Sequence, residues 1–146
     1  MSIRPFQILL VEDGPGDFEL VKTALENSGL KFSLDLVQEG TDVVAFLNRH
    51  EPYIDAKRPD LILIDLQFRN GVGDQTLKEI KSSHSLKIIP VIIISDSTRV
   101  EDVMISYNLG ANCYIIRPVD QAEFLKLIEI TMKFWLTMVK LPTRAR

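Results

Sequence analysis

Short apolar runs recur along the chain and alternate with segments whose apolar residues are three or four positions apart. The runs are ILLV (8–11), FSLDLV (32–37), LILI (61–64), VIIIS (91–95) and CYII (113–116). Strands that are apolar at successive positions are buried on both faces, which is typical of a parallel sheet covered by helices on either side. The pattern therefore predicts an α/β fold with a doubly wound, five-stranded parallel sheet.

The segments between the runs predict five helices. The first begins after Pro15-Gly16-Asp17, carries Phe18, Val21 and Leu25 on one face, and ends at Ser28-Gly29. We expect Asp17 to favour the start of this helix through the helix macrodipole. The last helix is expected from about residue 121 to 139.

Composition predicts a single domain. The chain has 146 residues, of which 46% are hydrophobic and 25% charged, as expected for one globular domain over 1–146. A net charge of −3 argues against nucleic acid or an anionic membrane as a partner. No apolar run approaches the roughly 20 residues that span a bilayer. A single cysteine, Cys113, excludes an internal disulfide framework, so we expect a cytoplasmic protein.

Polar side chains follow four of the five predicted strands. Glu12 and Asp13 follow the first strand, Asp65 ends the third, Ser95 ends the fourth and Arg117 follows the fifth. Ligands of open α/β sheets bind beyond the carboxyl ends of the strands. These carboxylates, the hydroxyl and the cation are therefore expected to meet at one edge of the sheet.

This set of side chains suits phosphoryl transfer. Clustered carboxylates repel one another, and Mg²⁺ is the usual counter-ion for a set of oxygen ligands. Glu12 and Asp13 can hold the metal, while Asp65 offers a carboxylate oxygen as a nucleophile towards phosphorus. Ser95 and Arg117 can then contact oxygens of the transferred group.

An acidic pair, an Asp, a hydroxyl and a basic-Pro pair on successive strand ends resemble the receiver domain of two-component response regulators. The resemblance covers about residues 6–141 and implies the flavodoxin-like receiver topology. It implies that Asp65 accepts a phosphoryl group from a sensor histidine kinase. It also implies that Glu12, Asp13, Asp65 and the backbone carbonyl of Gln67 bind Mg²⁺.

The resemblance also assigns the switch residues. Ser95 matches the hydroxyl that moves on phosphorylation, and Tyr114 matches the aromatic side chain that follows it. Arg117 stands where receivers have lysine, and Pro118 matches a position that is preceded by a cis peptide bond. Arg69 stands where receivers usually have proline. These two arginines put the efficiency of phosphorylation in question.

A narrower resemblance is to the small stand-alone response regulators that partner bacterial and cyanobacterial phytochromes. It is carried by VEDGPGDFELVKTAL, SLKIIPVIIISDS, ANCYIIRP and the ending FWLTMVKLP. It implies a phytochrome-type kinase as partner and a homodimer formed through the fourth and fifth helices, the last strand and the C-terminal extension. The receiver core is then about 6–133 and the dimerisation extension about 134–142.

The final predicted helix supports a dimer independently of the resemblance. Its apolar arc is wider than one sheet face requires, so part of it should be buried against another chain. The expected interface residues are Phe134, Trp135, Leu136, Val139 and Leu141.

Two other functions remain open. One is a pseudo-receiver that binds partners without phosphorylation because Arg117 supplies a permanent counter-charge. The other, a doubly wound enzyme or flavin carrier, is disfavoured because Glu12 and Asp13 would repel a cofactor phosphate. Haloacid-type phosphotransferases also carry a second Asp where this chain has Gln67. We therefore expect no enzyme, beyond catalysis of the chain's own phosphorylation and dephosphorylation. We expect the signal to pass onward by docking to a downstream protein partner.

Overall fold

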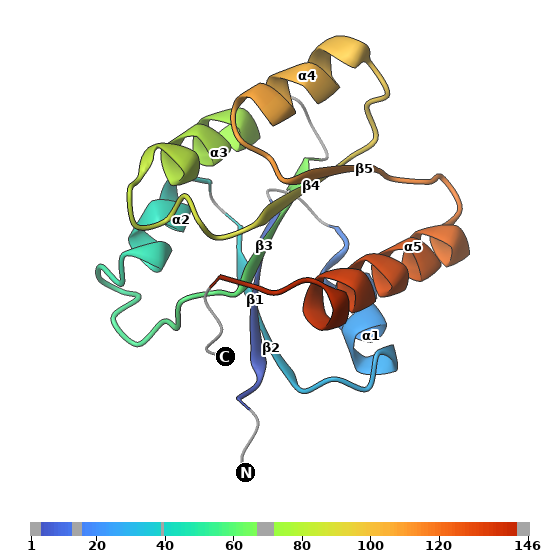
Figure 1. The fold of residues 1–146 in the computed structure, drawn as a ribbon, viewed down its shortest axis with the longest axis horizontal. Coiled ribbons are helices and arrows are strands. Elements are labelled where there is room, and N and C mark those ends of the chain that lie inside the picture. Colours follow the sequence, from blue (N-terminus) through green and yellow to red (C-terminus); the bar gives the residue numbers. More distant parts are fainter. Residues whose placement is uncertain (1–3, 13–15, 39, 67–71, 143–146) are drawn as a thin grey trace.

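A five-stranded parallel sheet forms the centre of the molecule (Figure 1). The computed structural model describes residues 4–12, 16–38, 40–66 and 72–142. The strands are β1 (Phe6–Glu12), β2 (Phe32–Val37), β3 (Leu61–Leu66), β4 (Val91–Ser95) and β5 (Cys113–Ile116). Their order is β2-β1-β3-β4-β5, and every neighbouring pair is parallel. The doubly wound, flavodoxin-like topology expected from the sequence is confirmed.

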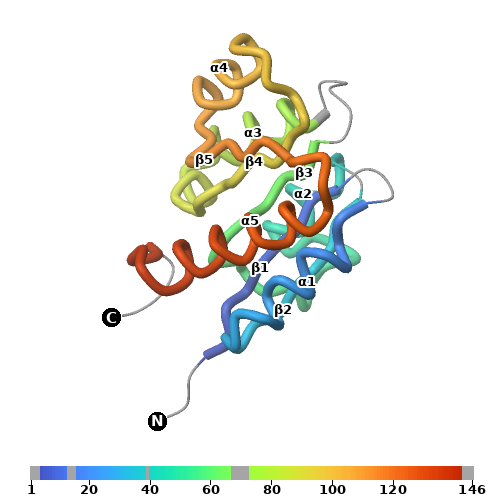
Figure 2. The backbone as a smooth tube through the Cα atoms, turned by 90° about the vertical axis from the view of Figure 1, so that its right-hand side faces the viewer, coloured from blue at the N-terminus to red at the C-terminus, as the bar shows by residue number. Residues whose placement is uncertain are grey.

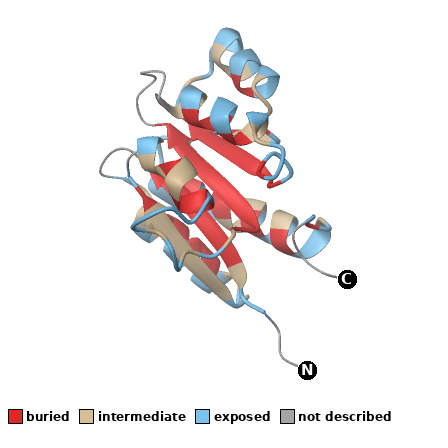
Figure 3. Ribbon diagram, turned by 90° about the vertical axis from the view of Figure 1, so that its left-hand side faces the viewer, coloured by how far each residue is buried: buried red, intermediate tan, exposed pale blue. Residues whose placement is uncertain are grey.

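Helices cover both faces of this sheet. They are α1 (Phe18–Asn27), α2 (Gly40–Leu47), α3 (Val72–Ser82), α4 (Val100–Asn108) and α5 (Gln121–Lys133). Helices α1 and α5 lie side by side on one face, and α2 and α3 lie on the other with α4 beyond them (Figures 1 and 2). The central strands β1, β3 and β4 are consequently the most buried part of the molecule, whereas the edge strands β2 and β5 are mostly half-buried (Figure 3).

Alternation along each strand divides the core in two. In β1, Leu9 and Val11 face α2 and α3, whereas Ile8 and Leu10 face α1 and α5. The same alternation holds in β3 and β4, where successive residues join opposite clusters. Apolar residues at consecutive positions are therefore required because both faces are covered.

The chain beyond α5 continues as one π-helical segment, Phe134–Met138. Its inward side chain, Leu136, is 5% exposed, and Leu141 further on is 3% exposed; both belong to the core on the α1–α5 face. The expected interface therefore needs a correction. Leu136 and Leu141 are buried within their own protomer, because both pack into the core between the sheet and the helices α1 and α5, and they cannot supply free surface to a second chain.

The connection from α2 to β3 begins with an unusual backbone conformation. Arg49 has a φ of +57°, and its backbone N–H donates to the Phe46 carbonyl at 3.2 Å, one of the hydrogen bonds that close the C-terminus of α2. A left-handed residue at this place after a helix is usually glycine, since a side chain there costs about 1 kcal/mol. Arginine at this position therefore needs an explanation other than backbone geometry.

Two further expectations concern the backbone. The Arg117–Pro118 bond, expected to be cis, is trans: Glu51–Pro52 is the one cis peptide bond among the described residues. The trans form is the intrinsically favoured one even before proline, and a cis bond persists only where the surroundings impose it. No helix in the described parts of the chain is long and apolar enough to cross a membrane.

Candidate functional site

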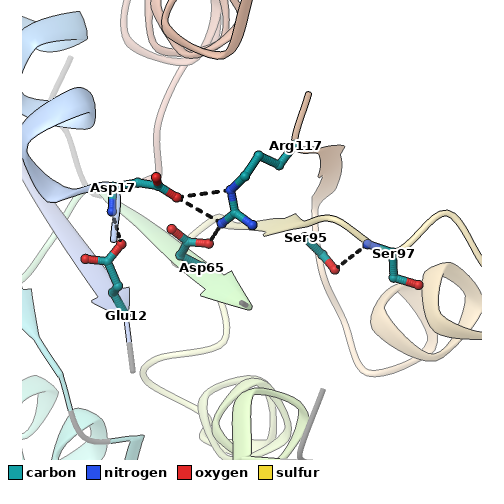
Figure 4. A network of polar contacts seen from close by, with 6 residues as sticks. All are labelled: Glu12, Asp17, Asp65, Ser95, Ser97 and Arg117. Atoms are coloured by element: carbon teal, nitrogen blue, oxygen red, sulfur yellow. Dashed lines mark hydrogen bonds and ion pairs between the residues drawn. The ribbon is translucent and has the colours of Figure 1, made fainter. Parts of the chain in front are cut away.

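The strand register brings the predicted site residues to one edge of the sheet. Glu12 pairs with Asp65 across β1 and β3, and Ser95 pairs with Leu66 across β3 and β4. The backbone N–H of Arg117 donates to the Ser95 carbonyl at 2.8 Å, which places Arg117 just beyond β5. Parallel strands end at the same edge, so residues far apart in sequence meet there (Figure 4).

Arg117 lies between two carboxylates. Its Nη2 atom forms ion pairs with Asp65 Oδ1 and, at 3.0 Å, with Asp17 Oδ2. Its Nε donates to the same Asp17 oxygen at 3.1 Å. The guanidinium carbon lies 5.4 Å from the centre of the Phe124 ring, a cation–π contact. The planar guanidinium thus bridges two acidic side chains, which a single ammonium reaches less readily.

Glu12 completes the acidic cluster. It is 2% exposed, and one carboxylate oxygen accepts a hydrogen bond of 2.5 Å from the backbone N–H of Asp17. Burial raises the pKa of Glu12, and repulsion from the Asp17 carboxylate adds to the rise. The Asp17 N–H bond and the charge of Arg117 act in the opposite direction. Ionised Glu12 is therefore unfavourable here unless a cation compensates it.

The acidic side chains fit a divalent cation. Glu12, Asp17 and Asp65 each offer an oxygen, and these oxygens all lie within 4.8 Å of one another. Carboxylate oxygens are the ligands that Mg²⁺ and Mn²⁺ prefer. Arg117 already neutralises part of this charge, so a bound ion and the guanidinium must share the same carboxylates.

The raised pKa of Glu12 predicts a pH-dependent stability. A carboxyl group whose pKa is higher in the folded chain stabilises the fold below its unfolded pKa, and this contribution is lost as the pH rises through the folded value. Glu12→Gln should therefore raise the melting temperature of the metal-free protein at neutral pH. This gain in melting temperature should vanish near pH 4, where the protonated Glu12 of the wild type is as uncharged as the amide that replaces it. Thermal denaturation across this range measures it.

The exposed Glu19→Gln in α1 is the matched control for this measurement. Its melting temperature should follow that of the wild type at each pH. Added Mg²⁺ should stabilise the wild type more than Glu12→Gln, because the variant lacks one anionic ligand. Equal melting temperatures for Glu12→Gln and the wild type at neutral pH would contradict the electrostatic account of Glu12.

Ser95 and Tyr114 are connected through the β4–α4 loop. Ser95 is fully buried, and its Oγ accepts a hydrogen bond of 3.1 Å from the backbone N–H of Ser97. The Tyr114 hydroxyl donates to the Ser97 carbonyl at 2.9 Å. The Ser97 hydroxyl in turn donates to Asp102 at 2.5 Å, near the start of α4. A displacement of Ser95 would thus reach both Tyr114 and α4 through Ser97.

Some predicted site residues lie outside the described part of the chain, namely Asp13, Gln67 and Arg69. Asp17, by contrast, is a site residue that the sequence interpretation missed. We expected it to act on the helix α1, but its side chain makes no capping hydrogen bond and instead pairs with Arg117. Its place on the connection after β1, at the edge where ligands bind, was the available signal.

Comparisons with known proteins agree with this geometry. Residues 8–129 match the response regulator receiver domain. Response regulator Rcp1 of Synechocystis sp. is 37% identical over 141 residues, which cover 97% of this chain and 96% of Rcp1.

Solved structures of response regulators are also similar to this chain. The phosphorylated cyanobacterial phytochrome response regulator RcpA has a TM-score of 0.89 at 36% identity, covering 96% of this chain and 100% of that one. The Mn²⁺-bound form of Rcp1 has a TM-score of 0.87 at 37% identity, covering 95% and 100%. With its sheet order, its acidic carboxyl edge and these matches, the chain belongs to the response regulator receiver domain family.

Proposed function

We propose that Asp65 is the residue of this response regulator that accepts the phosphoryl group. The observation that carries the proposal is the position of Asp65, whose carboxylate ends a central strand beside Glu12, Asp17 and Arg117. In the transfer, an Asp65 oxygen forms a bond to phosphorus while the bond from phosphorus to the donor breaks. Asp65 is 2% exposed, so its carboxylate has little contact with bulk water.

Other residues of the edge are assigned supporting roles. The Ser95 hydroxyl donates a hydrogen bond to one phosphoryl oxygen, and Arg117 pairs with another once it is released from Asp65. We propose Mg²⁺ as the ion, held by Glu12, Asp13, Asp65 and the Gln67 carbonyl, with Asp17 nearby. A divalent ion neutralises charge on the phosphoryl oxygens. Receivers bind divalent metals, and the Rcp1 structure contains Mn²⁺.

Incubation with acetyl phosphate and Mg²⁺, followed by intact-protein mass measurement, tests this function. We expect the mass of one phosphoryl group to be added, and none when EDTA removes the metal. Peptide mapping should place the group on Asp65. A chain that gains no phosphoryl mass at any Mg²⁺ concentration would contradict the proposal.

One observation favours a second candidate, the pseudo-receiver. The ion pair between Arg117 and Asp65 occupies a nucleophile oxygen with a built-in cation. If this pair persists, the chain is expected to bind partners in the same way with or without acetyl phosphate. Arg117→Lys distinguishes the two: recovery of phosphorylation in that variant would show that the guanidinium blocks an otherwise intact site.

The partner class follows from the family, because receivers take their phosphoryl group from histidine kinases. We propose that the kinase is a phytochrome, because similar proteins of known structure are response regulators of phytochromes. We further propose that the protein works in the cytoplasm and acts through protein contacts. On this view its only catalysis concerns its own phosphorylation and dephosphorylation.

We also propose that the protein forms a homodimer through α5 and the extension 134–142. Ile130, Phe134 and Met138 are four residues apart and are 61%, 49% and 79% exposed. Trp135 and Val139 are half-buried beside them, and Phe134 contacts Trp135 edge to face. Apolar side chains exposed along one helical row are unfavourable in water and favour a second copy.

The dimer proposal predicts that Phe134→Glu combined with Met138→Glu yields a monomer in sedimentation velocity. Two buried charges facing their symmetry equivalents should weaken association by at least about 100-fold. Ile88→Glu is the matched control, because Ile88 is 50% exposed but lies outside α5. A wild-type chain that sediments as a monomer at micromolar concentration would exclude the dimer.

A further inference from the structure

A basic cavity lies at the edge of the sheet opposite to the acidic site. It has a volume of about 420 Å³ and is lined by Arg4, Arg49, Lys57 and Arg58, and Asp55 is the one carboxylate among its described lining residues. The cavity lies at the amino ends of β1 and β3. Gln7, near the start of β1, lines it, and the Gln7 carbonyl accepts a hydrogen bond of 2.7 Å from the backbone N–H of Asp60, directly before β3. Figure 1 shows the α2–β3 connection at the end of the sheet where the chain begins.

The cations of this cavity are only partly neutralised. Arg4 pairs with the buried carboxylate of Asp60 at 3.3 Å, and Arg58 donates to the uncharged carbonyl of Ser85. The side chains of Arg49 and Lys57 make no ion pair or hydrogen bond with any described residue. On a chain with a net charge of −3, this local excess of positive charge is a focus for anions.

Arg49 gives a second, independent observation. It occupies a left-handed backbone conformation after α2, where glycine is the unstrained choice. Residues with strained backbone conformations cluster at functional sites, and Arg49 is one of the residues that line the cavity. A polar role in the cavity therefore explains a residue that backbone geometry disfavours.

The lining also has an apolar part. Pro5, Ile54 and Ala56 contribute to it, and Ile54 is 56% exposed. Pockets for small organic ligands have volumes of about 300–1,000 Å³ and combine apolar walls with a few charged groups. A cavity of this size can hold a compound as large as a mononucleotide but not a folded protein segment.

We propose that this cavity binds a small phosphate ester, with Arg49 and Lys57 on the phosphate and Ile54 against the organic part. Arginine and lysine are the side chains best suited to phosphate oxygens. The proposal does not depend on phosphorylation of Asp65, which lies at the opposite edge of the sheet. Binding here would give the receiver a second input besides the kinase.

Isothermal titration calorimetry of the full chain tests the proposal, with ADP and pyrophosphate as separate probes in EDTA. We expect saturable binding of one ADP per chain, tighter than that of pyrophosphate because Ile54 contacts the organic part. Arg49→Glu combined with Lys57→Glu should weaken ADP binding by at least about tenfold. Asp65→Asn should leave it unchanged.

Two control variants separate a site from general charge effects. Lys22→Glu with Lys78→Glu changes the net charge equally at exposed positions outside the cavity and should retain binding. Arg49→Gly should raise the melting temperature, by relieving the left-handed backbone, and yet weaken ADP binding. A variant that is more stable but binds less cannot be explained by unfolding.

Three results would overturn the proposal. They are no binding heat with either probe, equal weakening in the Lys22/Lys78 control, and pyrophosphate binding as tight as that of ADP. Equally tight binding of pyrophosphate would show that Ile54 does not contribute to affinity, and the ligand would then not need the organic part of an ester.

Discussion

Asp65→Asn is expected to abolish phosphoryl incorporation from acetyl phosphate completely. An amide oxygen is uncharged and poorly nucleophilic, so no acyl phosphate can form at this position. The substituted side chain keeps nearly the same shape, and the variant should therefore remain folded. The measurement is the intact mass after incubation with acetyl phosphate and Mg²⁺.

Asp96→Asn is the matched control. Asp96 directly follows Ser95 at the same edge, but its side chain is exposed, and it does not belong to the cluster of Glu12, Asp17 and Asp65. The control should take up phosphoryl groups like the wild type. If Asp65→Asn still gained Mg²⁺-dependent phosphoryl mass, the acceptor would be another residue, and Asp17 would be the first to test.

Arg117→Ala is expected to lower the free energy of unfolding of the metal-free protein by about 2–3 kcal/mol. Removing one partner of a buried ion pair typically costs about 3–5 kcal/mol. We expect a smaller loss of stability here, because the side chains of Arg117 and Asp17 are slightly exposed and water weakens their interaction. The loss leaves three carboxylates near one another without their counter-charge, and it removes the contact with Phe124. Urea denaturation with EDTA measures the effect.

Mg²⁺ should restore much of this stability, because an ion that binds only the folded chain stabilises it and relieves the same repulsion. Arg117→Lys is the control: it keeps the positive charge, so its loss should be clearly smaller. If Arg117→Ala and the wild type unfolded at the same urea concentration in EDTA, Arg117 would not be balancing the acidic cluster.

The fold was predictable because its signal is local and repeated. Both faces of every central strand are covered, so LILI and VIIIS are apolar at each position up to the strand end, and this pattern is legible without any tertiary information. The carboxyl-edge rule then placed Glu12, Asp65, Ser95 and Arg117 together.

The errors share a cause, which is that each depends on contacts between distant segments. Asp17 was interpreted from its neighbours in the chain, as a residue at a helix start. Its partner is Arg117, and only the packing of α1 beside α5 brings the two within hydrogen-bonding distance. The cis bond expected before Pro118 was likewise a conformation that the surroundings would have to impose.

The same distinction applies to the C-terminal extension. The width of its apolar arc was visible in the sequence, but which side chains face inward depends on the π-helical turn at 134–138. That turn sends Leu136 into the core and leaves Phe134 and Met138 exposed.

By itself, the sequence determined the strands, the order of the helices and the chemistry available at the carboxyl edge, since hydrophobic periodicity and strand ends are local properties. Only the tertiary structure decided that Arg117 joins Asp17 to Asp65 and that a basic cavity forms at the opposite edge. Both results come from charges brought together by packing, because electrostatic interactions depend on distance in space and not on separation along the chain.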